Sequence, residues 1–149
     1  MISAVTWPIS DVAGAAKMKT SALRQLYETG VLKLRGDDKR SIGSGHKAGL
    51  SRLRAYEAAI VQNLKLHGVS VSRGAKSAFE FTINGNAGRV PGQLFPLGRT
   101  ILTVSPSGAA VSNLALDSRV SDLFNDGVAV IVDCNKVVAE VDAALNSYN

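Results

Sequence analysis

Residues 9–32 read ISDVAGAAKMKTSALRQLYETGVL, and this stretch decides the expected fold. It predicts two short helices with a tight turn at residues 17–19 between them. Thr20 is the expected N-cap of the second helix, residues 21–29, and Gly30 follows where a left-handed glycine commonly ends a helix. Apolar side chains in this helix recur at helical spacing and polar ones face the opposite way: Ala22, Leu23, Leu26 and Tyr27 against Ser21, Arg24, Gln25 and Glu28. Such a helix fits the DNA major groove in a helix-turn-helix, although an ordinary helical hairpin with a solvated outer face has the same pattern.

The residues after Gly30 extend the pattern to helix, turn, helix, wing and helix. The sequence VLKLR at 31–35 alternates like a strand with one face inward. The polar loop GDDKRSIGSGHKAG follows at 36–49, and a helix then begins with SRLRAYEAAI at 51–60. Arg52 and Arg54 lie in the first turn of this helix, where acidic residues are normally favoured. DNA phosphates would supply the missing negative charge, so the loop and this helix are candidate backbone contacts.

The sequence MKTSALRQLYETGVL at 18–32 resembles the DNA-binding helix and following strand of MerR-family transcription regulators. The residues that match the family pattern without a gap are Met18, Leu23, Arg24, Glu28, Gly30, Val31 and Leu32. The helix at 51–67 and the following GVSVSRGAKSAFEF resemble the third and fourth helices of that family, so the likeness covers residues 9–81. It departs where the family has paired aromatic residues, which are Gln25 and Leu26 here, and the wing lacks the family's Gly-Tyr-Arg signature. The resemblance implies a winged helix-turn-helix shape more directly than the family's promoter mechanism.

Positive charge is concentrated in the N-terminal half of the chain. Residues 1–80 contain 13 Lys and Arg against 6 Asp and Glu, whereas residues 81–149 contain 4 against 6. The two parts therefore carry formal net charges of +7 and −2. A basic half beside a slightly acidic half favours a nucleic-acid-binding module joined to a second unit.

The second unit is expected at residues 99–149, after a Gly-, Asn- and Pro-rich linker or long loop at 82–98. Its pattern is strand, strand, short helix, strand, helix, with the third strand at 128–132 covered on both faces and the last helix capped by Asn135. The expected fold class is therefore α+β, a winged helix-turn-helix at 1–81 followed by a small ββαβα unit. That unit is small for an independent core. We therefore expect a symmetric homodimer formed through residues of about 99–149. The last helix of this unit offers an aliphatic stripe, which could instead cover the sheet of its own chain: Val137, Val141, Ala144 and Leu145.

Signals of enzymatic chemistry are weak. Cys134 is the single cysteine, and no histidine lies in the second unit to activate its thiol. One cysteine excludes an internal disulfide and a multi-cysteine zinc site. We therefore expect no catalytic residues, no metal and no cofactor. The absence of an apolar run of about 18 residues and of a basic secretory n-region leads us to expect a cytoplasmic protein without membrane contact.

The sequence thus predicts a DNA-binding transcription regulator, with repression as the favoured mode, that acts as a dimer on duplex DNA. An architectural or accessory DNA-binding protein, such as an excisionase-like, partition or packaging factor, would use the same module. A protein-interaction or small-ligand domain with an incidental basic surface is the third class. Base reading is expected from Ser21, Arg24 and Gln25, with Lys19 and Thr20 near the backbone. The expected phosphate contacts are Lys33, Arg35, Lys39, Arg40, Lys47, Arg52 and Arg54.

Overall fold

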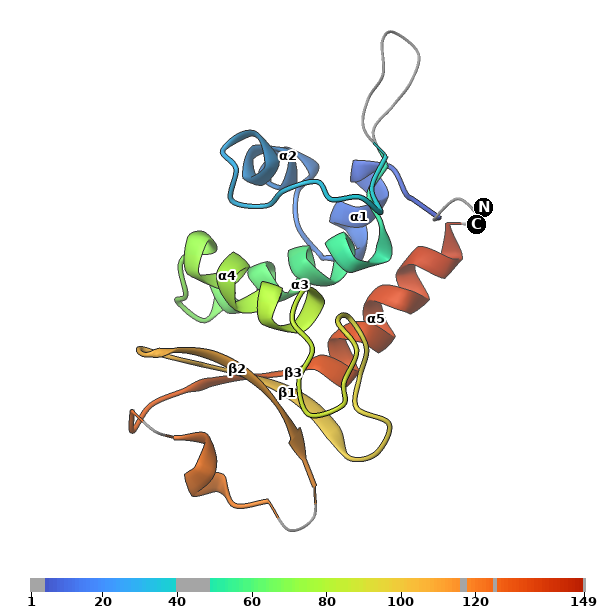
Figure 1. The fold of residues 1–149 in the computed structure, drawn as a ribbon. Helices are drawn as coiled ribbons and strands as arrows, with labels where there is room; N and C mark the ends of the chain where they lie inside the picture. Colours follow the sequence, from blue (N-terminus) through green and yellow to red (C-terminus); the bar gives the residue numbers. More distant parts are fainter. Residues whose placement is uncertain (1–4, 40–48, 116–117, 125, 149) are drawn as a thin grey trace, which may run out of the picture.

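The chain has a mixed α+β fold in which one long helix, α3, lies between a pair of short helices and a sheet (Figure 1). The structure is a computed structural model that describes residues 5–39, 49–115, 118–124 and 126–148. These residues contain five α-helices, one 3-10 turn and three strands, in this order: α1 (Ile9–Ala15), α2 (Thr20–Glu28), α3 (Arg52–Leu66), α4 (Val71–Thr82), β1 (Arg99–Ser105), β2 (Gly108–Leu114), η1 (Val120–Leu123), β3 (Val130–Asp133) and α5 (Cys134–Ser147).

Helix α3 is the centre of the hydrophobic core because it is surrounded on several sides. Helices α1, α4 and α5 all pack against it, and so does β3. Small side chains at Ala55, Ala58 and Ala59 are buried, which lets neighbouring helices approach closely. In Figure 1 α1 and α2 lie on one side of α3 and the sheet lies on the other. The core therefore runs from the N-terminal helices to the sheet without a break.

The sheet is antiparallel throughout, with the strand order β2-β1-β3. Leu102 of the central strand lies between Val111 and Val132, and these three side chains join the common core. The expectation that the third strand is covered on both faces was wrong. The strand begins two residues later, at Val130, and Ile131 is 42% exposed. An antiparallel edge strand needs cover on one face only, which explains why a run of apolar residues can still lie half in solvent.

Helix α5 starts one residue before the expected cap. Asp133 is the N-cap, and its carboxylate accepts a hydrogen bond from Lys136 N at 3.2 Å. Asn135 instead uses its side-chain oxygen to accept from Thr100 N at 2.7 Å, which ties α5 to β1. The aliphatic stripe on α5 is occupied within the chain, because Val141 and Leu145 are at most 1% exposed. The stripe therefore packs within its own chain, and the homodimer through residues of about 99–149 stays a prediction.

The two units expected from the sequence share one hydrophobic core. Trp7, near the start of the described chain, is 4% exposed and its indole N–H donates to the carbonyl oxygen of Leu145 at 3.2 Å. The division into two domains stays a prediction, but the described residues of both parts are packed together.

The loop between α4 and β1 is organised by a buried arginine. Arg89 is 4% exposed, and its guanidinium donates to the carbonyl oxygens of Phe81 at 2.9 Å and Asn84 at 2.7 Å. It also donates to the carbonyl oxygen of Glu80 at 3.1 Å. Two of these carbonyls belong to the last turn of α4, where they have no partner in the helix. Arg89 therefore ends α4 and fixes the path of the chain toward the sheet.

None of the helices in the described ranges has the length and apolar character needed to cross a lipid bilayer.

Candidate nucleic-acid interface

Helix α2 presents the expected polar face to solvent. Leu23 and Leu26 are buried, at 0% and 7% exposure, and hold the helix against the core. Ser21, Arg24, Gln25 and Glu28 on the other side are exposed. The helix begins one residue earlier than expected, with Lys19 at the N-cap position. Gly30 has φ 77°, so the expected left-handed glycine after the helix is confirmed.

Two grooves border α2, one on each side of its exposed face. The first, of about 540 Å³, separates α2 from the start of α1 and is called the Arg24 groove; its lining residues are Pro8, Ile9, Ser10, Thr20, Arg24, Tyr27, Leu34 and Leu50. The second, of about 300 Å³, separates α2 from α3 and α4 and is called the Gln25 groove; its lining includes Met18, Ala22, Gln25, Thr29, Val61, Gln62, Lys65 and Val71. Arg24 therefore lines the groove on one side of α2, and Gln25 lines the groove on the other side.

The segment at 31–50 is not built as expected. The predicted strand at 31–35 is absent, because these residues have no regular secondary structure and pair with no strand of the described chain. Leu32 is buried and Lys33 exposed, so the alternation in the sequence reflects an extended chain that packs one leucine into the core. Further along, Lys39 and Gly49 pair as an antiparallel bridge, with N–O distances of 2.7 and 2.8 Å. Arg40 and Lys47 lie between these two residues and outside the described part of the chain.

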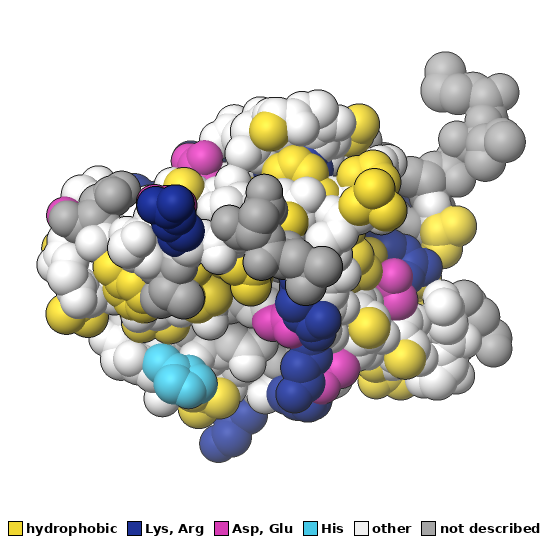
Figure 2. Space-filling model, turned by 90° about the horizontal axis from the view of Figure 1, so that it is seen from below, with side chains coloured by type: hydrophobic (Ala, Val, Ile, Leu, Met, Phe, Trp, Pro, Cys, Tyr) yellow, Lys and Arg dark blue, Asp and Glu magenta, His cyan; other side chains and the backbone are white. Residues whose placement is uncertain are grey.

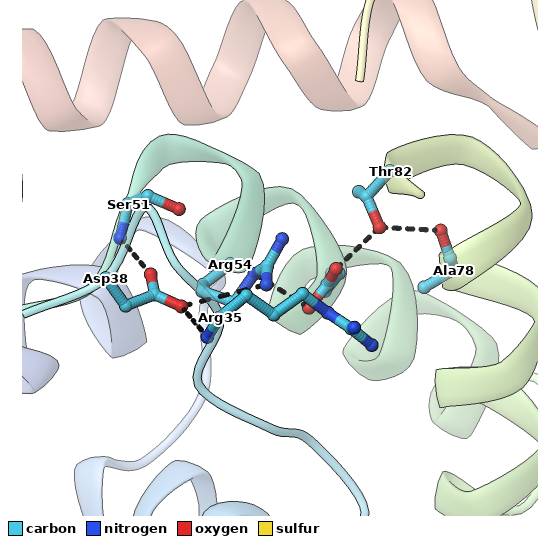
Figure 3. Close-up of polar contacts among 7 residues, drawn as sticks. Arg35, Asp38, Ser51, Arg54, Ala78 and Thr82 are labelled. Atoms are coloured by element: carbon cyan, nitrogen blue, oxygen red, sulfur yellow. Dashed lines mark hydrogen bonds and ion pairs between the residues drawn. The ribbon is translucent and has the colours of Figure 1, made fainter. Parts of the chain in front are cut away.

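A buried ionic cluster fixes the base of this segment (Figure 3). We call Asp38, Arg54, Glu57 and Thr82 the Arg54 cluster. Arg54 Nη1 lies 3.7 Å from Asp38 Oδ2, and Arg54 Nε lies 3.1 Å from Glu57 Oε1. The Thr82 hydroxyl donates to Glu57 Oε2 at 2.5 Å. The cluster thus joins the 31–50 segment to α3 and α4.

Asp38 has a second role as an acceptor for the backbone. Its Oδ2 accepts from Arg35 N and its Oδ1 accepts from Ser51 N, each at 2.7 Å. These two amides lie near opposite ends of the 36–50 loop. One carboxylate therefore holds both ends of the loop together and ties them to Arg54.

The expectation that Arg54 contacts phosphates was wrong. Its side chain is 1% exposed and faces Asp38 and Glu57, so its charge is neutralised inside the protein. The available signal was the acidic Glu57 three residues later within an otherwise apolar run, since a buried charge requires a partner of opposite sign.

Arg52 is also engaged within the chain. Its Nη1 donates to Asp142 Oδ1 at 2.6 Å, and its guanidinium lies 5.1 Å from the centre of the Trp7 ring. Tyr56 donates to the same Asp142 oxygen at 2.6 Å. Arg52 therefore joins α3 to α5. The sequence offered no signal for a partner 90 residues away.

The remaining predicted site residues fall into two groups. Arg35 is half-buried, with its guanidinium 5.1 Å from the centre of the Phe79 ring, and Thr20 is half-buried in the Arg24 groove. The exposed residues lie at the N-cap of α2, on α2 or on the segment that follows it, and are Lys19, Ser21, Arg24, Gln25, Lys33 and Lys39. These six side chains remain as the candidate surface.

Tyr27 connects the Arg24 groove with the Arg54 cluster. Tyr27 lines the groove, and its hydroxyl oxygen is buried and has no hydrogen-bond partner among the described atoms. Burial and the carboxylates of Glu57 and Asp38 raise the pKa of this hydroxyl. The phenol therefore stays neutral at the edge of the ionic cluster.

Cys134 lies at the start of α5 and is fully buried. Burial raises the pKa of its thiol to about 12. The thiol is therefore protonated near neutral pH, and a buried protonated thiol is a poor nucleophile.

Comparison with known proteins adds no relative: no protein-family model matches the chain, and no curated protein is detectably similar to it. The resemblance to MerR regulators stays a prediction that rests on the residues quoted above.

We predict that Glu57 makes the stability of the protein depend on pH. Burial raises the pKa of Glu57 from 4.5 to about 7, although Arg54 and Thr82 lower it. The folded state then holds the Glu57 proton more tightly than the unfolded chain does. The resulting stabilisation is fully present below about pH 4.5 and is lost as the pH rises through about 7, and it amounts to roughly 3 kcal/mol.

Urea unfolding at a series of pH values measures this effect as the difference in unfolding free energy between the wild-type protein and Glu57→Gln. The unfolding free energy of the wild type, relative to that of Glu57→Gln, should fall as the pH rises from about 4.5 to 7. Thr82→Val is the matched variant, because loss of its hydroxyl donor should move the transition to higher pH. A difference between wild type and Glu57→Gln that is constant with pH would contradict the prediction.

Proposed function

We propose that the chain is a sequence-specific DNA-binding protein in which α1, the turn at 16–19 and α2 form a helix-turn-helix and the 31–50 segment is its wing. The proposal rests chiefly on α2, a helix with a buried side at Leu23 and Leu26 and an exposed side that projects between two grooves. Nine residues of helix span about 14 Å, and the DNA major groove is about 12 Å wide. Arg24 and Gln25 carry the two side chains best suited to grip guanine and adenine in bidentate fashion.

The distribution of paired and unpaired charge supports the same surface. Within the described part of the chain, Lys19, Arg24, Lys33 and Lys39 have no carboxylate within 4.0 Å. Elsewhere, Lys17 and Lys136 both pair with Glu140, and Figure 2 shows Lys and Arg side chains next to Asp and Glu on the face seen from below. The four unpaired cations around α2 leave positive potential there, which would attract a polyanion.

We further propose that the protein regulates transcription as a cytoplasmic repressor and binds as two copies on adjacent half-sites. A single short recognition helix contacts few bases, so modules of this kind commonly act in pairs. The contact between copies would use a surface other than the buried α5 stripe. An architectural protein would use the same α2 surface but would show a much lower ratio of specific to non-specific affinity.

We predict that Gln25→Ala weakens the preference for one or two base pairs. Loss of a bidentate contact to a base should remove roughly 1–3 kcal/mol of discrimination at those positions. The measurement is a selection of binding sequences from a random duplex pool, followed by affinities for each single-base variant. Gln93→Ala, the same replacement in the exposed loop before β1, is the control. An unaltered preference in Gln25→Ala would show that α2 is not the reader.

We also predict that Lys33 and Lys39 supply affinity without sequence information. Replacing either by Gln should reduce the slope of log affinity against log salt concentration by about 1, because one phosphate contact and its released counterion are lost. Lys136→Gln should leave the slope unchanged, since this lysine lies on α5 beside Glu140. Arg52→Gln should also leave it unchanged. A fall of the slope in Arg52→Gln but not in Lys33→Gln would move the interface from α2 to the α3–α5 side.

A further inference from the structure

The Arg24 groove has the size and lining of a small-molecule site. Its volume of about 540 Å³ falls within the range of roughly 300–1,000 Å³ typical of ligand pockets. Apolar side chains from three parts of the chain form its walls, namely Ile9 at the start of α1, Tyr27 on α2, and Leu34 and Leu50 at the two ends of the loop. A cavity of this kind can take an apolar body out of water.

The charge around the groove is of one sign. Arg24 is the only charged residue among the described residues that line it, and no carboxylate of the described chain lies within 4.0 Å of it. Ser10, Thr20 and Tyr27 are the other lining residues with polar side-chain groups. The planar guanidinium of Arg24 suits a carboxylate, which can accept two parallel hydrogen bonds from arginine.

We infer that the Arg24 groove binds an amphipathic organic carboxylate, with its ring or chain against Ile9, Tyr27 and Leu34 and its carboxylate on Arg24. An inorganic phosphate or a DNA phosphate would satisfy the charge but would leave the apolar walls in contact with water. A neutral aromatic compound would fill the walls but would leave the guanidinium unpaired. A compound that carries both an apolar body and a carboxylate matches the apolar walls and the guanidinium together.

This site deepens the proposed function, on which its regulatory part rests. Arg24 is also the proposed reader of a guanine, so one guanidinium cannot serve a bound carboxylate and a base together. The carboxylate and DNA would therefore compete directly, and each would weaken the binding of the other by the same factor. Such a compound would release a repressor from its operator.

The test uses 2-naphthoate and its neutral analogue 2-naphthamide, which have nearly the same size and differ in charge. Titration of the full chain without DNA, followed by calorimetry or by naphthyl fluorescence, should show saturable binding of 2-naphthoate about tenfold tighter than that of 2-naphthamide. Arg24→Gln should abolish the difference between the two compounds, and Arg24→Lys should restore part of it. Equal affinities in the wild-type protein, or no saturable binding, would overturn the inference.

A second pair of variants tests the location. Ser10→Trp places a large side chain in the groove from an exposed position, so it should block both compounds without removing a core residue. Ser147→Trp, exposed on α5, should bind both as the wild type does. Urea midpoints close to that of the wild type establish that both variants are folded. Unchanged binding in folded Ser10→Trp would overturn the assignment to this groove.

A DNA titration separates this inference from the proposed function. Saturating 2-naphthoate should weaken binding to a selected duplex, and Ser10→Trp should make DNA binding insensitive to the compound. Binding of 2-naphthoate by a chain that binds no DNA would support the ligand site and contradict the proposed function. DNA binding that is unaffected by bound 2-naphthoate would overturn the competition.

Discussion

The fold depends on the need of one buried cation for partners of opposite charge. Arg54 is 1% exposed in the middle of the core, and an unpaired charge there would be prohibitively costly. Asp38 supplies the opposite charge, and Glu57 adds to it as its carboxyl ionises near pH 7; the removal of one partner from a buried ion pair typically costs about 3–5 kcal/mol. Because Asp38 also accepts the backbone amides of Arg35 and Ser51, the electrostatic requirement of α3 determines how the loop beside α2 begins and ends.

This arrangement divides the basic residues of the N-terminal half into two kinds. Arg52 and Arg54 use their charge inside the chain, the first against Asp142 on α5 and the second against Asp38 and Glu57. The lysines and Arg24 around α2 have no such partners in the described chain and keep their charge for solvent or a ligand. The proposed DNA-binding surface is therefore smaller than the total charge of +7 on residues 1–80 suggests, and it is centred on α2.

The parts of the fold that could be predicted are those that depend on nearby residues. Leu23, Leu26 and Gly30 define α2 to within one residue, and the strands β1 and β2 follow directly from their apolar pattern and turn. Burial of Arg54 could not be predicted, because it depends on an aspartate from a separate loop. The alternation at 31–35 suggested a strand, yet no strand of the described residues pairs with it. Likewise, the sequence pattern of the apolar stripe on α5 is the same whether the stripe packs on its own chain or on another copy, so the pattern could not decide between them.

We propose that DNA contacts α2 and the cations beside it, and not the arginines of α3 or the sheet. Amide chemical shifts of the 15N-labelled protein, recorded during titration with a duplex selected from a random pool, test this residue by residue. We expect the largest chemical-shift changes at residues 19–25 and 33–39, and only small changes in β1, β3 and α5. Changes concentrated on the sheet and α5, or the absence of changes with a duplex at saturating concentration, would contradict it.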